Sequence, residues 1–283
     1  MAYRNDRNIT GEIPPFRRIL AHLTPDRDHA AIYFKQQLDL SRTMPWIEAE
    51  RARTGKKISF LHVFLAATGR MLHLRPKLNR YVTGWRIYQR DGVFITISVK
   101  KELKDGAKLV MIKVPISPDE TPESVHDKVV AMVSEGRSGE THDEKEEAFF
   151  IKIPGVILRR LVGLVLWLDR WHLLPGAFTD PDPMFTSMVA ANLGSVGLEP
   201  AYHHLYEYGN CPFFAAIGAI RDTPVAAAGQ VALHPALEVK YTFDERVEDG
   251  LACALSLAGQ RELIEDPERF ATGTTDHAGE VPR

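Results

Sequence analysis

A dense group of charged residues lies where a strand-like segment meets a helix-like segment, in the stretch YTFDERVEDGLACALSL at residues 241–257. Four carboxylates and one arginine fall within the six positions from Asp244 to Asp249. Such a density of charge is unusual for a plain strand-to-helix connection. Glu245 lies in its middle, and a carboxylate can act as a general base where burial raises its pKa toward neutrality. The turn is therefore the first candidate for chemistry.

The histidines are a second set of candidates, and the adjacent pair His203 and His204 is the most conspicuous. Adjacent residues on an extended segment point in opposite directions, so this pair is not expected to bind a metal ion jointly. We expect surface or packing roles for both, although either one could reach a channel from a neighbouring subunit. His234, before Pro235, is predicted to be structural. The acidic run DEKEE is predicted to be a solvated loop, and no metal site is predicted.

Composition and charge are those of an ordinary globular protein, with 45% hydrophobic and 25% charged residues. The formal net charge of −2 gives no electrostatic reason to expect nucleic acid as a partner. Cys211 and Cys253 are too few for a disulfide framework and are predicted to be buried thiols in a reducing compartment. The N-terminal segment has no apolar run of signal-peptide length, so a cytoplasmic location is expected.

Hydrophobic periodicity predicts a protein that mixes helices and strands. Helices are expected within residues 14–30, 44–56, 58–76, 121–137, 153–176 and 250–266. Strands are expected within residues 31–41, 85–90, 93–102, 108–117, 184–194, 213–220 and 229–244. Asp91-Gly92 is predicted to be the turn between the second and third of these strands. The segment 138–147 is the most solvated.

The most apolar part of the chain is IPGVILRRLVGLVLWLDRWHLLPG, at residues 153–176. Its longest uncharged run, Leu161 to Leu168, is far shorter than the roughly 20 residues that a membrane-spanning helix needs. A helix between Pro154 and Pro175, apolar around most of its circumference, is predicted to be buried or to form an interface. Packing within its subunit or between subunits is expected, and a peripheral membrane contact is the alternative.

The order and spacing of several segments resemble one family, the catalytic domain of 2-oxo acid dehydrogenase dihydrolipoyl acyltransferases. The segments are ISFLHVFLAATGRMLHLRPKLNRYV, VFITISVKKE, ANLGSVGL, FFAAIGAI and YTFDERVEDGLACALSLAGQRELIEDPERF. The resemblance extends from Ile13 to Phe270, and its most specific part is the last segment, where the family has Asp-His-Arg-x-x-Asp-Gly. It implies an α/β fold of mixed α+β type, similar to chloramphenicol acetyltransferase, with a mixed sheet flanked by helices.

The resemblance also implies the domain organisation and the assembly. One acyltransferase-like domain is expected at residues 1–270, with an inserted apolar helix near 153–176 and a polar tail at 271–283. Family members usually carry lipoyl and subunit-binding domains as well, for which these 283 residues have no room. A homotrimer, or a higher multiple of three, is implied. In the family an apolar C-terminal segment helps to join trimers into cages, and the polar tail here is a poor match to it.

The resemblance implies an active site at the subunit boundary, where coenzyme A and the acyl acceptor enter a channel from opposite ends. In the family the His of the turn deprotonates the acceptor thiol. A Ser or Thr just before an Asn-Leu-Gly motif stabilises the oxyanion. The Asp before the Gly helps to hold the turn, against an Arg near the N-terminus.

In this chain the residues that hold the turn in shape match the family, whereas the two positions that perform the chemistry, the general base and the oxyanion donor, are changed. The His position is Glu245, and the Ser/Thr position before Asn192-Leu193-Gly194 is Ala191. The residues predicted to stabilise the turn are Asp244, Arg246, Asp249, Gly250 and either Arg17 or Arg18. The candidates for the channel are Asn192, Gly194, Ser195, His203 and His204.

Both changes weaken the family's reaction. A Glu carboxyl titrates near 4.3 and a thiol near 8.5, so the carboxylate is a weak base for a thiol proton. Loss of an oxyanion donor costs roughly 3 kcal/mol at such sites. The sequence thus predicts a stand-alone trimeric scaffold or ligand-binding subunit that requires no cofactor, with coenzyme A or acyl-coenzyme A as the implied ligand. The alternatives are an active coenzyme A-dependent acyltransferase with Glu245 as base, and a peripheral membrane-associated structural protein.

Overall fold

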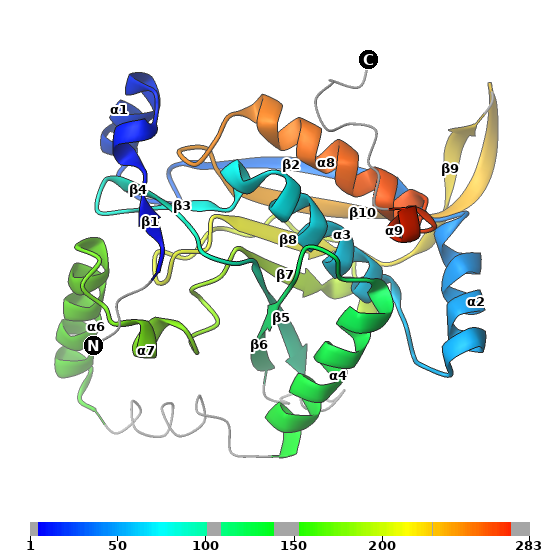
Figure 1. The fold of residues 1–283 in the computed structure, drawn as a ribbon, viewed down its shortest axis with the longest axis horizontal. Helices are drawn as coiled ribbons and strands as arrows, with labels where there is room; N and C mark the ends of the chain where they lie inside the picture. Colours follow the sequence, from blue (N-terminus) through cyan, green and yellow to red (C-terminus); the bar gives the residue numbers. More distant parts are fainter. Residues whose placement is uncertain (1–4, 101–108, 139–152, 228, 273–283) are drawn as a thin grey trace.

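The computed structural model describes residues 5–100, 109–138, 153–227 and 229–272. Its centre is a sheet in the order β2-β10-β8-β7-β5-β6, with β9 paired to β10 (Figure 1). The strands are β2 (Ala31–Asp39), β5 (Phe94–Lys100), β6 (Leu109–Pro115), β7 (Met188–Asn192), β8 (Phe213–Ile217), β9 (Arg221–Ala227) and β10 (Gln230–Asp244). β7 runs parallel to β5 and β8, whereas the other described pairs of this sheet are antiparallel. The predicted mixed sheet is confirmed.

Helices pack on one face of this sheet (Figure 1). They are α3 (Phe60–Leu74), α4 (Pro122–Ser138) and α8 (Gly250–Glu265), with α2 (Thr43–Thr54) and the short α9 (Arg269–Thr272) beside them. α3 lies deepest because apolar side chains surround nearly its whole circumference, and Val63, Phe64 and Ala67 are completely buried. These helices lie where hydrophobic periodicity predicts them.

A small apolar cluster lies apart from the main core, around the start of β8. It consists of Val189, Leu205, Cys211, Phe214 and Ala216. Cys211 and Cys253 are both free and buried, as predicted. Burial raises the pKa of each thiol, that of Cys253 to about 12. Neither thiol is therefore a ready nucleophile at neutral pH.

A second sheet corrects one prediction from the sequence. It has the order β1-β4-β3, formed by β1 (Arg7–Asn8), β3 (Arg80–Thr83) and β4 (Arg86–Gln89). The expected hairpin of β4 with β5 through Asp91-Gly92 is wrong, because β4 pairs with β1 and β3 and β5 belongs to the main sheet. The hairpin turn is instead Gly84-Trp85, both at positive φ, 53° and 60°. A tryptophan in this conformation is unusual, so the turn carries no familiar sequence signal.

The N-terminal segment lies against this second sheet. It contains the single turn η1 (Thr10–Glu12) and α1 (Pro15–Leu23), and a further single turn, η2 (Pro76–Leu78), leads into β3. α1 is strongly amphipathic, but its apolar stripe of Phe16, Ile19 and Leu23 faces solvent. An exposed apolar stripe of this kind is typical of a surface that contacts another molecule.

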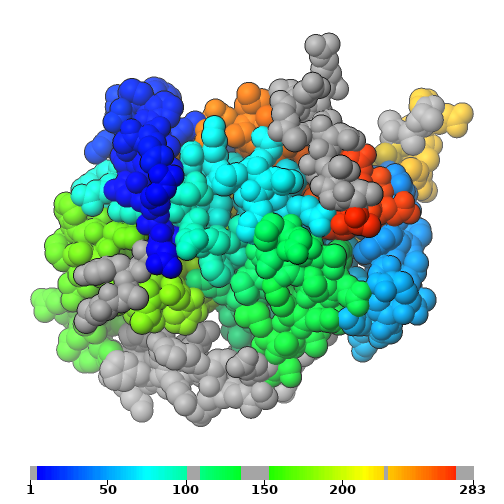
Figure 2. Space-filling view, in the orientation of Figure 1, coloured from blue at the N-terminus to red at the C-terminus, as the bar shows by residue number. Residues whose placement is uncertain are grey.

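β9 was not predicted, and with the first part of β10 it forms a two-stranded ribbon that projects from the body of the molecule (Figures 1 and 2). The ribbon pairs from Gln230 opposite Ala227 to Ala236 opposite Arg221. Val231 and Leu233 on it are exposed. An isolated two-stranded ribbon is marginally stable in water, so this one also indicates a covering partner.

The apolar segment forms α6 (Gly155–Arg170) and the short α7 (Gly176–Thr179), which agrees with the predicted helix between Pro154 and Pro175. The expectation that it packs within its own subunit is wrong for most of α6. Of the α6 residues only Asp169 is buried, and the large apolar side chains of its outer face are exposed. No helix in the described part of the chain is both long and apolar enough to cross a membrane.

Candidate functional site

β10 ends in a turn that a buried ion pair holds in shape. Arg246 donates from Nε and Nη2 to the two carboxylate oxygens of Asp244, at 2.8 and 2.7 Å. The backbone N–H of Arg246 donates to the same carboxylate at 3.1 Å. Nη1 of Arg246 donates to the carbonyls of Thr24 and Pro25, at 2.9 and 3.1 Å. The turn is thus fixed both internally and to the segment that follows α1.

Arg17, on α1, is the N-terminal arginine of this site. Its guanidinium lies 3.2 Å from the carboxylate of Glu248 and 3.7 Å from that of Asp249, and donates to the carbonyl of Glu245 at 3.1 Å. The contact with Asp249 is the one that the sequence suggested for Arg17 or Arg18. Arg18 makes no such contact among the described residues, and its Nε is buried without a hydrogen-bond partner there.

Glu248 is the residue of this site that the sequence reasoning missed. Arg80, on β3, approaches its carboxylate at 3.1 Å, so Glu248 lies between Arg80 and Arg17. Its place in the charged turn was a signal, whereas nothing in the sequence placed Arg80 beside it because β3 was not predicted. Asp249 has a different task, since it is the N-cap of α8 and accepts from the N–H of Ala252 at 2.9 Å.

Glu245 lies within the turn and is half-buried. Its backbone N–H donates to the carbonyl of Ala30 at 3.0 Å, and its own carbonyl accepts from Arg17. Its carboxylate forms no hydrogen bond or ion pair with the residues that the structure describes. Gly250, at the start of α8, has open space where a Cβ would be, so no close packing requires a glycine there. The backbone of Glu245 is therefore fixed while its side chain is available to a ligand or to another subunit.

The second chemical position lies where β7 ends. Ala191 is half-buried and offers only a methyl group. Asn192 caps η3 (Leu193–Val196) by accepting from the N–H of Ser195 at 3.2 Å, and the Ser195 hydroxyl donates back to the Asn192 carbonyl at 2.7 Å. Gly194 packs so closely on the chain after β8 that a Cβ would lie 2.3 Å from a carbonyl oxygen. These three channel candidates thus have local structural roles, and the Ser195 hydroxyl is engaged by the Asn192 carbonyl.

Glu245 and Ala191 lie far apart within one subunit. Ala191 pairs with Ala216, which in turn pairs with Lys240, so Ala191 is level with a residue five positions before Glu245. At about 3.3 Å per residue the two are about 16 Å apart along the strands, and two strand spacings, about 10 Å, across the sheet. Side chains of one chain cannot bridge this separation. A site that uses both positions has to combine two subunits.

The structure corrects the expectation that His203 and His204 point in opposite directions. Their rings stack, with centroids 4.8 Å apart and planes inclined by 13°, because the segment is not an extended strand. His203 also stacks on Phe214 at 4.0 Å. His234 is 2.6 Å from the carboxylate of Asp39. Among the described residues, no group of three or more His, Cys, Asp or Glu side chains is arranged to hold a metal ion.

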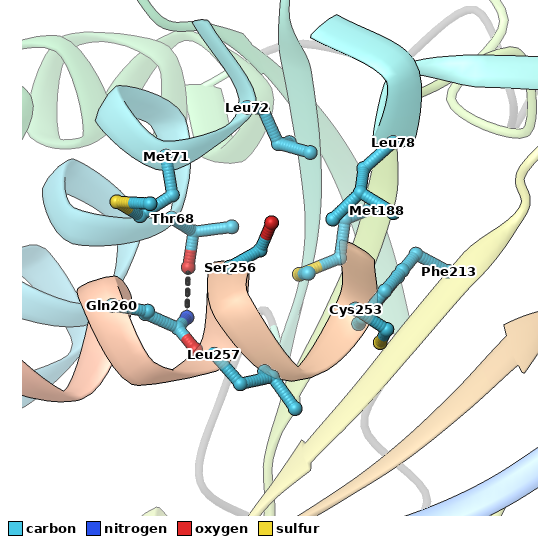
Figure 3. A pocket seen from close by; sticks show the side chains of 10 residues that line it. All are labelled: Thr68, Met71, Leu72, Leu78, Met188, Phe213, Cys253, Ser256, Leu257 and Gln260. Carbon is cyan, nitrogen blue, oxygen red and sulfur yellow. Dashed lines mark hydrogen bonds between the residues drawn. The ribbon is translucent and has the colours of Figure 1, made fainter. Parts of the chain in front are cut away.

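A cavity behind α8 is too small for an acyl ligand. Its volume is about 20 Å³, close to what a single water molecule requires. Figure 3 shows the side chains of α3 and α8 that line it together with Leu78, Met188 and Phe213. Gln260 donates to the hydroxyl of Thr68 at 2.6 Å beside this cavity. It is a packing defect of the core and not a substrate site.

A larger cleft, of about 400 Å³, lies between α6 and the segment after α1. α6 contributes Gly163, Leu166, Trp167, Asp169 and Arg170, and the opposite wall contains residues 25–27, residues 82–85, Glu207 and Arg246. Arg246 connects this cleft to the charged turn. Its volume is within the range of small-molecule sites. Among the described cavities, this cleft lies next to the charged turn and is large enough for a small-molecule ligand.

Comparison with known proteins identifies the architecture around this turn. Residues 187–272 match the family described as 2-oxoacid dehydrogenases acyltransferase (catalytic domain). The probable dihydrolipoamide acetyltransferase of Listeria monocytogenes 4b F2365 matches with a TM-score of 0.61 and 14% identity, over 90% of this chain and 94% of that one. The predicted family resemblance is confirmed. This acyltransferase-like chain matches no curated protein by sequence.

Further solved structures show the same fold. The cubic core of the pyruvate dehydrogenase multienzyme complex gives a TM-score of 0.60 at 14% identity, over 93% of this chain and 91% of that one. Chloramphenicol acetyltransferase gives 0.52 at 11% identity, over 92% and 98%. The acetyltransferase of Azotobacter vinelandii gives 0.61 at 15% identity, over 93% and 91%, in work on the roles of a serine, a histidine and an asparagine in its catalytic mechanism. The predicted chloramphenicol acetyltransferase-like fold is thus confirmed.

Proposed function

We propose that this chain is a homotrimeric acyltransferase-fold protein in which acyl transfer between a thiol and coenzyme A is lost or much reduced. It serves as a scaffold or ligand-binding subunit, and the ligand that its fold suggests is coenzyme A or an acyl-coenzyme A. A cytoplasmic, reducing location is part of the proposal, supported by the two buried free cysteines.

One observation supports this proposal above the others. The contacts that hold the turn in shape are all formed, but the side chain at its centre is a carboxylate instead of an imidazole. The Asp244–Arg246 pair and the Arg17 contacts are all formed around Glu245. A frame kept in this detail indicates that the position still matters for structure or ligand binding. The carboxylate at its centre changes what the position can do chemically.

Spacing supports the assignment of the two changed positions. In the Azotobacter vinelandii enzyme the histidine and the asparagine are four residues apart, as are Glu245 and Asp249 here. The serine there precedes the histidine by 52 residues, and Ala191 precedes Glu245 by 54. On this assignment, which the near-equal spacing supports to within two residues, Glu245 takes the place of that enzyme's histidine and Ala191 the place of its serine.

These two changes act in the same direction. A carboxylate takes a thiol proton far less readily than an imidazole, because its ordinary pKa is about four units below that of the thiol. A methyl group cannot donate a hydrogen bond to a tetrahedral oxyanion, and one such donor contributes roughly 3 kcal/mol to the transition state. The combination therefore disfavours both the deprotonation of the acceptor thiol and the formation of the tetrahedral intermediate.

Three features of the single subunit support the trimer. Glu245 and Ala191 can contribute to one site only across a subunit boundary, as their strand registers require. The apolar stripe of α1 and the projecting β9-β10 ribbon are both exposed. A copy of the same chain can cover these surfaces in a closed ring with three-fold symmetry.

The test is a gain of function. The double variant Glu245→His, Ala191→Ser restores a neutral base and a hydroxyl donor while leaving the frame untouched. With acetyl-coenzyme A and dihydrolipoamide it should transfer acetyl groups at least tenfold faster than the wild type, since one general base alone contributes about 10²-fold or more. If the wild type is the faster protein, Glu245 is the base of an active transferase, and that result overturns the proposal.

A further inference from the structure

The outer face of α6 is an exposed apolar surface that no described residue of its own subunit covers. Val156, Ile157, Leu161, Leu164 and Trp167 all have side chains at least two-fifths exposed. α6 lies at one edge of the molecule, coloured light green in Figure 2, on the same side as the blue α1. Soluble proteins rarely leave a contiguous surface of this kind in water.

The C-terminal end of α6 is rigidly attached, which fixes the direction of this face. Thr83 donates to the carbonyl of Asp169 at 3.1 Å, and a Cβ at Gly84 would lie 1.7 Å from the carbonyl oxygen of Arg170. The guanidinium of Arg170 lies over the ring of Trp85, 4.6 Å from its centroid, and Trp171 contacts the same ring edge-on. The unusual turn at Trp85 thus anchors α6, and the rest of the helix is presented outward.

The charged side chains on the exposed part of α6 are all basic. Arg159 and Arg160 are exposed there, whereas Arg170 is held over Trp85 and the one acidic residue of the helix, Asp169, is buried. The whole chain has a formal net charge of −2, so this surface is locally cationic on a slightly acidic protein. Apolar side chains combined with arginines are the composition of helices that lie in the interface of an anionic membrane.

A two-fold contact of α6 with the α6 of a second copy is a poorer match to this face. A symmetric contact of α6 with itself would place arginines of one subunit against arginines of the other, with no exposed carboxylate on the helix to neutralise them. In a lipid interface the guanidinium groups reach phosphate oxygens while the aliphatic stems stay in the apolar layer. Trp167, which lies at the rim of the cleft and is 53% exposed, is the side-chain type that favours this boundary.

We propose that α6 seats the protein on an anionic lipid surface, lying in the plane of the interface with its outer face in the headgroup region. At about 1.5 Å per residue the helix is about 24 Å long, shorter than the hydrocarbon core of a bilayer. Membrane binding through α6 does not depend on whether the charged turn supports catalysis, because the turn contributes no residue to the outer face of the helix.

Vesicle flotation of the full chain tests the proposal directly. The wild type should float with vesicles of phosphatidylcholine and phosphatidylglycerol, should not float with phosphatidylcholine alone, and should lose binding as salt is raised. Leu164→Glu should reduce the vesicle partition coefficient at least tenfold. Leu74→Glu, at a side chain of similar exposure (54% against 51%) at the end of α3, is the matched control and should leave it unchanged.

A second pair of variants tests the charge. The double variant Arg159→Gln, Arg160→Gln should weaken binding to anionic vesicles about 30-fold, because each basic residue near such a surface contributes a factor of about five. The control Lys57→Gln, Lys77→Gln removes the same charge elsewhere and should have little effect. Absence of flotation with anionic vesicles, or equal flotation of Leu164→Glu, overturns the proposal. A lipid-free loss of oligomeric mass in Leu164→Glu also overturns it, because a second copy would then be what covers α6.

Discussion

Arg246 and Asp244 form a bidentate ion pair that is almost entirely shielded from solvent, at the point where β10 enters the charged turn. The pair is separated by a single residue, Glu245, so its geometry sets the direction in which that residue is presented. Because Arg246 also donates to two carbonyls after α1, the same pair connects the end of β10 to the N-terminal segment. The stability of the site therefore depends on groups that take no part in its chemistry.

Asp244→Ala is expected to destabilise the protein by about 3–5 kcal/mol, because it leaves the Arg246 guanidinium buried without its counter-charge. Urea unfolding followed by circular dichroism measures the change. Glu199→Ala removes the exposed pair with Arg221 and should cost less than about 1 kcal/mol. Equal effects of the two variants would show that burial does not strengthen the dependence on the Asp244 pair.

Asp249→Ala is expected to cost about 1 kcal/mol, chiefly because α8 loses its N-cap. Arg17 is not left without a partner in this variant, since Glu248 remains at 3.2 Å. Asp249→Asn keeps a side-chain acceptor for the N–H of Ala252 and should be close to wild type in the same unfolding assay. A loss in Asp249→Asn as large as that in Asp249→Ala would point to the ion pair with Arg17 as the main contribution, because both variants remove the charge and only Asp249→Ala removes the cap.

His62 makes stability depend on pH on the acidic side. Burial, with further contributions from nearby His126 and Arg51, lowers the pKa of His62 to about 4 from an ordinary 6.5. The unfolded chain thus binds a proton more readily than the folded one, so stability is complete above about pH 6.5 and falls as the pH drops toward 4. The loss over this window is about 3 kcal/mol.

His62→Gln isolates this effect. The N–H of Ser59 donates to Nδ1 of His62, and a glutamine at the same position can accept that hydrogen bond in a capping box. The variant should therefore show a flatter dependence of unfolding free energy on pH between about 6.5 and 4. An unchanged slope would assign the acid sensitivity to other groups.

The trimer is expected to have the mass of three 31.8-kDa chains in light scattering without detergent or lipid. Phe270, the large apolar residue near the C-terminal end, is buried on its own subunit beneath Arg70, so it is not free to dock on a neighbouring trimer. Leu233→Asp on the β9-β10 ribbon should shift the mass toward one chain, whereas Leu74→Asp should not. A wild-type monomer would remove the basis for a site shared between subunits.

Much of the fold was predictable because hydrophobic periodicity is a local signal. The positions of α3, α8 and β2 follow directly from their apolar spacing. The hairpin of β3 and β4 was not predictable, since its turn is Gly84-Trp85, and tryptophan at positive φ is not a turn signal. β9 was missed for another reason, because Pro224 lies within it and proline demotes a segment that otherwise resembles a strand.

The site was partly predictable for a similar reason. The turn residues Asp244, Arg246 and Asp249 are adjacent in the sequence, and their density of charge marks them. The contact of Arg80 with Glu248 joins positions 168 residues apart, so only the folded chain brings them together. The outward orientation of α6 also depends on tertiary anchoring at Trp85. A helix with apolar residues on most sides does not specify which of its faces is covered.

The acetyl-transfer rate of the wild-type protein tests the central claim most directly. It is measured with acetyl-coenzyme A and dihydrolipoamide, at neutral pH, on protein whose oligomeric mass has been determined in the same buffer. With Glu245 and Ala191 in place we expect turnover far below about 1 per second, the lower end of ordinary enzymes. Turnover at or above that rate would contradict the account, because the turn would then support thiol acylation without a histidine and without an oxyanion hydroxyl.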